Sequence, residues 1–227
     1  MSAHDRPALR LAGITRRFGR RWALRGIDLE VSRGTVLAVL GANGTGKTTL
    51  LRILGTLLRP TAGRAEVLGA NVMKHPDQIR RVTALMTPGG HAYDELTGLE
   101  NLRFAARMGG GDVDARAHRA ALAHVGLEEA GDLPVRGYST GMRKRLELAR
   151  LGLRSPDLVL LDEPFASLDE AGVELVQESI TGWREGGATV LIASHRLTQA
   201  GRHADRTVRI ERGRIIERGS TLEAKPE

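Results

Sequence analysis

The sequence contains no cysteine, few aromatic residues and no long uncharged apolar run. The absence of cysteine excludes a disulfide scaffold, thiolate metal ligands and a thiol nucleophile. No stretch approaches the roughly 18 apolar residues of a membrane-spanning helix, and residues 1–10 lack the apolar segment of a secretory signal. A soluble, cytosolic protein is therefore expected. Aromatic residues make up only 3% of the chain, so aliphatic side chains must fill its core.

The composition is that of a folded protein of one or two domains, with 227 residues, 41% hydrophobic and 27% charged. The formal net charge is +7, and only four of the 34 basic residues are lysines. A positive surface attracts nucleic acid, anionic lipid or nucleotides, but solvated arginines explain the excess equally well. No interleaving of arginines with aromatic residues is recognised, so a stacking platform for single-stranded nucleic acid is not predicted.

Apolar runs bounded by glycine mark the expected strands. Continuous runs at 35–40, 158–161 and 189–193 are typical of strands buried on both faces. Helical patterns begin near Lys47 and after Asp169, and this alternation predicts a parallel sheet covered by helices. Residues 9–31 alternate loosely and predict short antiparallel strands, and residues 208–216 predict a hairpin around Gly213.

The segment from about 96 to 153 has helix-favouring composition and no convincing buried strand, which predicts an all-helical insert. One helical face is expected to carry Ala117, Ala120, Ala121, Leu122 and Val125, with Gly126 as its end, and another Leu146, Ala149 and Leu153. Three glycines at 109–111 predict a flexible break inside the insert.

A phosphate-binding loop is predicted between the first buried strand and its helix. Its residues are Gly41, Ala42, Asn43, Gly44, Thr45, Gly46, Lys47 and Thr48. Small residues let backbone N–H groups converge on phosphate oxygens, and the following helix adds its positive N-terminal end. Lys47 is expected to reach the β- and γ-phosphates, Thr48 to offer its hydroxyl to Mg²⁺, and Thr49 to contact the α-phosphate region. The alternative is a glycine-rich turn with an incidental lysine.

Two adjacent carboxylates follow the second buried strand. Asp162 suits a Mg²⁺ ligand, because this ion keeps several waters and takes one or two carboxylates. Glu163 suits a base that polarises water for attack on the γ-phosphate. Strands often end in acidic residues, but together with the phosphate loop this pair predicts an NTPase. The guanine-reading Asn-Lys-x-Asp pattern is absent, which argues against a GTPase.

A second anion-binding helix end is predicted at Ser139 and Gly141, before the helix that begins near Arg143. One phosphate loop already serves the nucleotide, so this end suggests a second molecule closing over the same ATP. Taken in isolation, an ordinary helix cap explains the pattern as well.

The chain resembles the ATP-binding subunits of ABC transporters over nearly its whole length, because five motifs follow one another along the sequence in the order found in that family. Phe18 stands where that family stacks an aromatic ring on adenine, and His195 stands at its switch histidine. The signature motif corresponds to residues 138–142, including Ser139, Thr140, Gly141 and Met142, and the dimer-contact loop to residues 165–169, ending at Asp169. The resemblance implies a phosphate-loop NTPase of ABC type: an α/β fold with a mainly parallel RecA-like sheet core, a small N-terminal antiparallel β subdomain and an inserted helical subdomain. Residues 1–90 and 155–227 would form the core, and about 91–154 the insert with the signature motif.

The resemblance also implies a mechanism. Two copies would pair head-to-tail around two ATP molecules with Mg²⁺, and hydrolysis through Glu163, His195 and Lys47 would reopen the dimer. The helical insert would convey this motion to a separate integral membrane subunit, holding the protein on the cytoplasmic face of the membrane. No nucleic acid partner is expected. The groove around Met86, Tyr93, Leu96, Leu99, Phe104 and Met108 is the predicted partner surface, although buried packing is favoured for Leu99 and Phe104.

Two departures from the family pattern affect the chemistry. The family has a glutamine between core and insert, whereas residues 86–91 contain none, with Pro88 or Gly89 nearest its position. The expected consequence is slow hydrolysis, unless ordered water or His91 takes the place of the missing glutamine. In the signature motif, Thr140 replaces a glycine and Met142 replaces a glutamine, while Ser139 and Gly141 remain.

Within the family, the signature motif and dimer-contact loop look most similar to the haem-exporter subunits of cytochrome c maturation. Drug-type exporters share much of this pattern. The chain ends soon after the predicted hairpin and is expected to lack an added regulatory domain. The competing classes are a soluble ABC ATPase acting on nucleic acid or ribosomes and a small-molecule kinase, which would need neither Ser139 nor His195.

Overall fold

A computed structural model describes residues 6–88, 90–109, 114–196, 200 and 203–220. The chain divides into two compact units. Unit 1 comprises residues 1–85, 156–163 and 180–227, and unit 2 comprises residues 86–155 and 164–179. Helix α6 (Glu170–Glu185) belongs partly to each unit.

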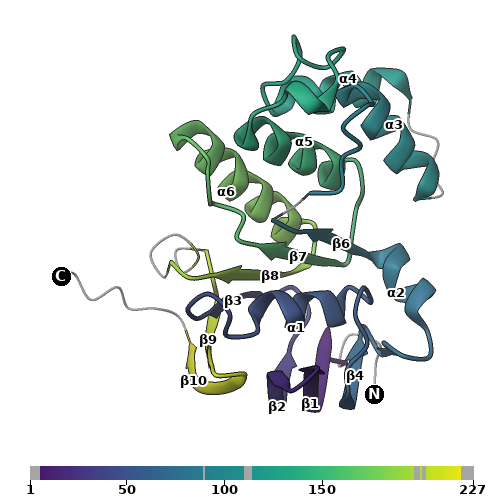
Figure 1. Cartoon of the computed structure of the whole chain (residues 1–227). Coiled ribbons are helices and arrows are strands. Elements are labelled where there is room, and N and C mark those ends of the chain that lie inside the picture. Colours follow the sequence, from purple (N-terminus) through teal and green to yellow (C-terminus); the bar gives the residue numbers. More distant parts are fainter. Residues whose placement is uncertain (1–5, 89, 110–113, 197–199, 201–202, 221–227) are drawn as a thin grey trace. The chain divides into compact units, whose positions relative to one another are not determined.

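Unit 1 contains two sheets (Figure 1). The four-stranded antiparallel sheet has the order β2 (Arg21–Val31), β1 (Leu9–Phe18), β4 (Ala62–Val67) and β5 (Ala70–Asn71). The six-stranded sheet has the order β10 (Arg214–Ser220), β9 (Arg206–Glu211), β3 (Val36–Leu40), β8 (Thr189–Ser194), β7 (Leu158–Asp162) and β6 (Thr83–Met86). Met86, the last residue of β6, belongs to unit 2. Strand β3 pairs in parallel with β8 and β9, and β7 pairs in parallel with β8.

The core of unit 1 lies around helix α1 (Lys47–Leu54), which contacts strands of both sheets (Figure 1). Every residue of β3, β7 and β8 is buried. This matches their continuous apolar sequences, because helices or a second sheet must cover both faces of a parallel sheet. The strands predicted at 35–40, 158–161 and 189–193, the N-terminal antiparallel strands and the hairpin around Gly213 are confirmed. Helix α2 (Pro76–Val82) completes the regular structure of unit 1.

Unit 2 is built from α3 (Gly98–Met108), α4 (Ala115–His124), the short 3₁₀ helix η2 (Val135–Gly137), α5 (Thr140–Gly152) and the first part of α6. Side chains cap three helices. Thr97 and Glu100 form a capping box on α3, Asp114 caps α4, and Ser139 caps α5. Each cap satisfies backbone N–H groups that a helix start leaves unpaired. The all-helical character predicted for residues 96–153 is confirmed.

One expectation about this region is wrong. Ala120 was expected on the buried face of α4 but is exposed. The buried face of this helix instead includes the ring of His118, which the predicted apolar face did not contain. Residues 164–179 group with residues 86–155 in unit 2, and the predicted domain boundaries stay a prediction. The cause is local: the Lys144 ammonium donates to backbone carbonyls of this segment, and Arg145 pairs with Asp169. Of the predicted flexible break, only Gly109 belongs to the described residues, where it caps α3.

Candidate functional site

The loop between β3 and α1 has a backbone that requires glycine at two positions. Gly41 has φ 154°, and an added Cβ there would lie 2.3 Å from the Ile210 carbonyl oxygen. Gly46 has φ 115°, and its Cβ would lie 2.5 Å from the Ala23 carbonyl oxygen. L-amino acids with side chains rarely adopt such angles, so packing as well as conformation selects glycine. The strand, loop and helix therefore have the geometry of a phosphate cradle.

Lys47 is held inside this loop. Its side chain is 5% exposed, and its ammonium donates to the carbonyl oxygens of Gly41 at 2.7 Å and Ala42 at 3.2 Å. The same nitrogen lies 3.6 Å from Oε1 of Glu163. A triphosphate entering the loop would compete for this ammonium with two carbonyls and one carboxylate.

Asp162 ends β7 and is 1% exposed. Both of its carboxylate oxygens are buried without a hydrogen-bond partner among the described residues. Burial raises the pKa of Asp162 and Glu163 adds to this, while Thr48 and Lys47 offset the rise only in part. Unpartnered buried oxygens are costly unless a cation or donor is bound. These oxygens beside Thr48 therefore fit a Mg²⁺ ligand set.

Glu163 and His195 meet at the carboxyl ends of neighbouring parallel strands. Nδ1 of His195 lies 2.9 Å from Oε2 of Glu163, and the Ser194 hydroxyl lies 3.5 Å from the same oxygen. Glu163 has φ 50°, and its N–H donates to the Ala193 carbonyl at 2.9 Å. A non-glycine residue in this conformation is strained, and such strain concentrates at functional sites. The fold thus brings Lys47 close to the polar residues at the ends of β7 and β8. These are Asp162, Glu163, Ser194 and His195.

The turn between β1 and β2 lies beside the loop and combines arginines with aromatic rings. Phe18, at the end of β1, is 48% exposed. The Arg16 guanidinium lies 4.5 Å from the centre of its ring, and that of Arg17 lies 5.4 Å from the centre of Trp22. The expectation that arginines and aromatic residues do not interleave is therefore wrong for this hairpin. Its strand register brings these side chains together across a two-residue turn.

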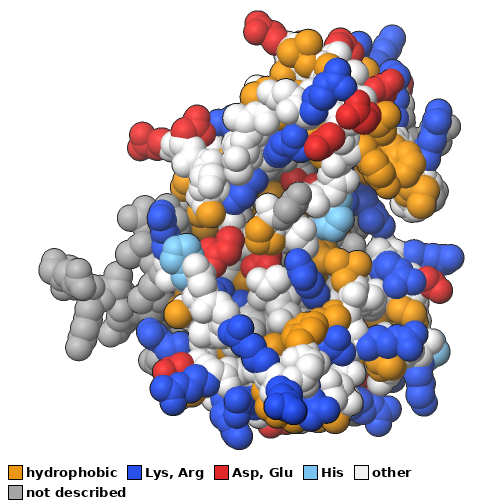
Figure 2. Space-filling model, viewed as in Figure 1, with side chains coloured by type: hydrophobic (Ala, Val, Ile, Leu, Met, Phe, Trp, Pro, Cys, Tyr) orange, Lys and Arg blue, Asp and Glu red, His pale blue; other side chains and the backbone are white. Residues whose placement is uncertain are grey.

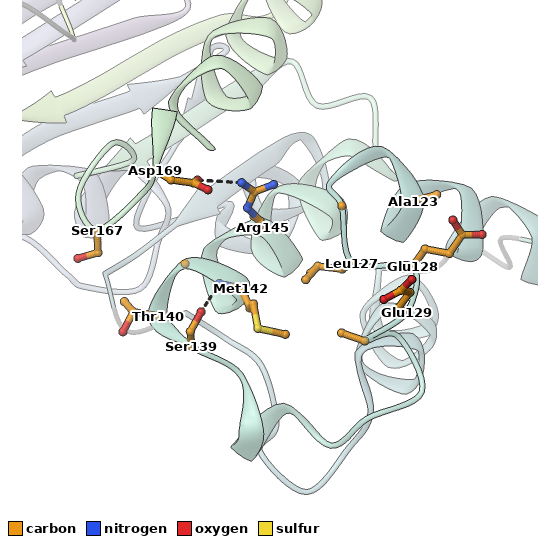
Figure 3. Close-up of a pocket in the computed structure, with 13 residues that line it drawn as sticks. Ala123, Leu127, Glu128, Glu129, Ser139, Thr140, Met142, Arg145, Ser167 and Asp169 are labelled. Carbon is orange, nitrogen blue, oxygen red and sulfur yellow. Dashed lines mark hydrogen bonds and ion pairs between the residues drawn. The ribbon is translucent and has the colours of Figure 1, made fainter. Parts of the chain in front are cut away.

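The signature residues line a pocket of about 940 Å³ that lies within unit 2 (Figure 3). The Ser139 hydroxyl accepts from the Met142 N–H at 3.2 Å at the start of α5. Glu128 and Glu129 lie on the opposite side of the pocket from Ser139 (Figure 3). The pocket is lined by Ala123, Gly126, Leu127, Glu128, Glu129, Ala130, Ser139, Thr140, Gly141, Met142, Arg145, Ser167 and Asp169. The structure therefore joins the two predicted dimer motifs in one surface.

Arg145 connects these motifs and was not predicted as a site residue. Its guanidinium donates to Oδ1 of Asp169 at 2.8 Å (Figure 3). The same oxygen accepts from the Gly172 N–H at 3.0 Å. These two donors, with the Arg145 charge, lower the pKa of Asp169. Asp169 therefore begins α6 and anchors it to α5. The only sequence signal for Arg145 was its place on the helix after the signature motif.

A buried carboxylate forms a second group in unit 2. The Glu147 side chain is 4% exposed, with one oxygen 3.2 Å from Nδ1 of His91 and the other accepting from Nε of Arg150 at 3.1 Å. Burial raises the pKa of Glu147, but the His91 hydrogen bond and the Arg150 charge outweigh it and leave the pKa below its ordinary value. His91, considered as a substitute for the missing glutamine, thus has a partner on α5. Gly89 lies outside the described residues, and Pro88 is exposed.

The predicted partner surface is only partly exposed. Tyr93 is 52% exposed and Met108 is 74% exposed, whereas Met86 and Leu99 are buried. Phe104 was expected to be a buried packing residue and is instead 40% exposed, forming an edge-to-face pair with Tyr93 at 4.9 Å between ring centres. The prediction for Phe104 is therefore wrong, because its ring packs against this tyrosine at the surface of unit 2.

The described residues contain no cluster of three metal-ligating side chains and no helix long and apolar enough to cross a bilayer. A Mg²⁺ ion at Asp162 and Thr48 would take its remaining ligands from nucleotide phosphates and water, which is common for this ion.

Comparison with known proteins defines the class of this fold and site. Residues 24–166 match the family model of the ABC transporter ATP-binding domain, and the chain belongs to this family. A solved ATP-binding subunit of an ABC transporter superposes with a TM-score of 0.85 at 28% identity, covering 94% of this chain and 90% of that one. An ATP-binding cassette solved as a dimer in a post-hydrolysis state with ADP and Pi has the same fold, with a TM-score of 0.86, 23% identity and coverage of 94% and 99%. The predicted family and fold class are confirmed.

Two relatives differ in the process that their names state. The chain is 41% identical over 223 residues to the daunorubicin resistance ATP-binding protein DrrA3 of Streptomyces coeruleorubidus, covering 97% of this chain and 70% of that protein. It is 40% identical over 172 residues to the cytochrome c biogenesis ATP-binding export protein CcmA 2 of Cupriavidus metallidurans, covering 75% and 81%. Both names describe ATP-binding proteins, one named for daunorubicin resistance and the other for cytochrome c biogenesis.

Proposed function

We propose that this protein is the ATP-hydrolysing subunit of an ABC exporter, and that two copies dimerise around two ATP molecules to drive a separate membrane subunit. The observation that carries the proposal is the convergence of Lys47, Asp162, Glu163 and His195 beside the glycine loop of unit 1. Family membership supports nucleotide binding, and the relatives support coupling to transport.

In the proposed reaction, a water oxygen attacks the γ-phosphorus and the bond from that phosphorus to the β–γ bridging oxygen breaks. The departing water proton passes to Glu163, whose carboxylate is held by His195 at 2.9 Å. Lys47 leaves its carbonyl partners and contacts the β- and γ-phosphates. Thr48 and Asp162 would hold Mg²⁺, which would supply neutralisation of the developing charge on the phosphate oxygens. The products are ADP and phosphate.

Dimerisation places the nucleotide of one copy against the signature pocket of the other. Ser139 and the N–H groups at the start of α5 form an anion-binding end that faces the pocket (Figure 3). ATP then acts as a ligand of the closed dimer and shifts the population by its greater affinity for that state. Asp169 and Arg145 hold the dimer-contact loop beside this end.

Glu163→Gln tests the chemical step. Single-turnover ATP cleavage should fall at least about 100-fold, because the amide cannot accept the water proton, while ATP binding should persist. Glu211→Gln, at the exposed end of β9, is the matched control and should cleave at the wild-type rate. Cleavage by Glu163→Gln at the control rate would remove Glu163 as the base.

The membrane subunit is proposed to dock on the exposed aromatic surface of unit 2, formed by Tyr93, Phe104 and Met108. Figure 2 shows hydrophobic side chains gathered over α3 with basic side chains nearby. Arg103 and Arg107 are exposed on the same helix, so an apolar segment carrying carboxylates would complement this surface. Such docking would hold the protein at the cytoplasmic face of the membrane.

Tyr93→Asp tests this surface by placing a charge in its centre. Recovery of the membrane subunit in a pull-down should fall at least about tenfold, as expected for loss of a buried aromatic anchor. Met73→Asp, at a 47% exposed site of unit 1, is the control. Undiminished recovery with Tyr93→Asp would refute the docking site.

The cargo is proposed to be either haem for cytochrome c assembly or a drug-type small molecule. The signature and dimer-contact residues suggested the first, and the relative that covers 97% of this chain supports the second. Deletion of the gene distinguishes them: loss of covalent haem in c-type cytochromes supports haem export, and increased drug sensitivity with intact cytochromes supports the alternative.

A further inference from the structure

Arg21 reaches the phosphate loop from the neighbouring antiparallel sheet. It is the first residue of β2 and pairs in register with Phe18 across the two-residue turn at 19–20. Nη2 of its guanidinium lies 3.5 Å from the position that a Cβ on Gly44 would occupy. Both residues belong to unit 1, so this approach is internal to one compact body.

The guanidinium has no partner that would explain its position. Among the described residues, the Arg21 side chain makes no hydrogen bond and no ion pair, and the residue is exposed. Two arginines on the paired strand β1 do have partners close to the turn. Arg16 stacks on Phe18 and donates to the Arg59 carbonyl at 3.0 Å, and Arg17 stacks on Trp22. Arg21 is thus a cation placed over the loop and left available to a ligand.

The chemistry of the loop identifies that ligand as an anion. The loop has open space above Gly44, where the Arg21 guanidinium is the only atom group within 4 Å of an added Cβ in the described part of the chain. Lys47 is turned inward on the carbonyls of Gly41 and Ala42. An incoming phosphate group therefore meets Arg21 at the exposed side of the loop before it displaces those carbonyls. A planar guanidinium can donate two parallel hydrogen bonds to phosphate oxygens.

We propose that Arg21 is a further nucleotide-binding residue, which contacts the α- and β-phosphates from above Gly44 while Phe18 stacks on the base. This inference rests on the proposed function, since it assumes that the loop holds a nucleoside diphosphate or triphosphate. It adds a residue from the four-stranded sheet to a phosphate site that the six-stranded sheet and α1 otherwise form. Arg21 should add to the affinity only for ligands that carry phosphates, because adenosine offers its guanidinium no anion.

The test compares ADP and adenosine binding to the wild-type chain and to Arg21→Ala, by calorimetry or fluorescence competition. Loss of a charge-assisted contact at an exposed site should weaken ADP binding about tenfold, while adenosine binding should change by less than about twofold. The ADP affinity of Arg21→Ala should also depend less on ionic strength than that of the wild type. Arg21→Lys should recover part of the affinity, because it restores charge without the planar fork.

Arg20→Ala is the matched control, since it removes an exposed arginine from the same turn and should bind ADP as the wild type does. Arg21→Gln is a second variant that keeps a polar side chain at the start of β2. Equal ADP affinity of Arg21→Ala, Arg21→Gln and the wild type would overturn the role of Arg21 alone. Equal losses of ADP and adenosine binding would also overturn it, because they would indicate a structural effect. Failure of the wild-type chain to bind ADP would overturn the proposed function as well.

Discussion

Replacing Glu147 with glutamine should destabilise unit 2 through a single buried carboxylate. Its side chain is 4% exposed and accepts from both His91 and Arg150. Glutamine removes the charge and turns an amide donor toward one of these donors. Breaking a buried ion pair costs about 3–5 kcal/mol, and an unsatisfied buried group about 1–3 kcal/mol. Because the His91 and Arg150 side chains are 43% and 23% exposed, water can solvate them, and we expect a loss of about 2–3 kcal/mol.

The pH dependence follows from the sign of the pKa shift. The pKa of Glu147 in the folded protein lies below its ordinary value of 4.5. Its stabilising contribution is therefore fully present above that value, and it is lost as the pH falls through the lower folded pKa. The difference in unfolding free energy between wild type and Glu147→Gln should be largest near neutral pH and should shrink below about pH 4.5.

Urea unfolding, followed by circular dichroism at several pH values, measures this difference. Glu174→Gln, at an exposed position of α6 in unit 2, is the control and should change the unfolding free energy by less than about 0.5 kcal/mol. A loss in Glu147→Gln no greater than that of the control would refute the reasoning, and so would a loss that grows in acid.

Two further changes test the glycines of the two anion-binding ends. Gly46→Ala should lower the unfolding free energy by about 2–4 kcal/mol, because at φ 115° its Cβ would lie 2.5 Å from the Ala23 carbonyl oxygen. The control is Gly182→Ala, which has open space around it in α6 and should be neutral or stabilising. Thermal melts that give the two variants the same stability would contradict this prediction. Gly141→Asp in the Glu163→Gln background should abolish the ATP-dependent dimer in light scattering, because it sets a carboxylate against the partner's phosphates. Gly141→Ala should keep the dimer, since its Cβ meets only ordinary contacts at 3.5 Å or more, and a persisting dimer in Gly141→Asp would contradict the head-to-tail model.

Much of the candidate site was predictable because its signals are local. The glycine pattern before Lys47 specifies a tight phosphate loop, and the apolar strand before Asp162 specifies a buried parallel strand. Parallel strands end at the same edge of a sheet. The approach of Glu163 to His195 therefore follows once both strands are recognised, and the structure shows it at 2.9 Å.

Other parts of the site were not predictable because they depend on pairings between distant residues. Glu147 lies on a helix whose pattern indicated only an amphipathic face. Arg150 is three residues further along the same helix, but the second partner of Glu147 appears only when the loop at His91 packs on α5. The exposure of Phe104 depends on its contact with Tyr93 rather than on helical period. The interleaving of arginines and aromatic rings is visible in the printed sequence, but the stacking requires the register of β1 and β2.

The sequence by itself determined the class of fold and the chemical groups at the phosphate site, because backbone freedom, burial pattern and residue type are properties of short segments. Only the tertiary structure decided that Lys47 is held by its own loop, that the two oxygens of Asp162 are buried without partners, and that Arg21 stands over Gly44. The first depends on how the loop folds back on its own lysine, and the other two depend on atoms brought together from separate strands. Packing rather than local sequence pattern sets the positions of such atoms.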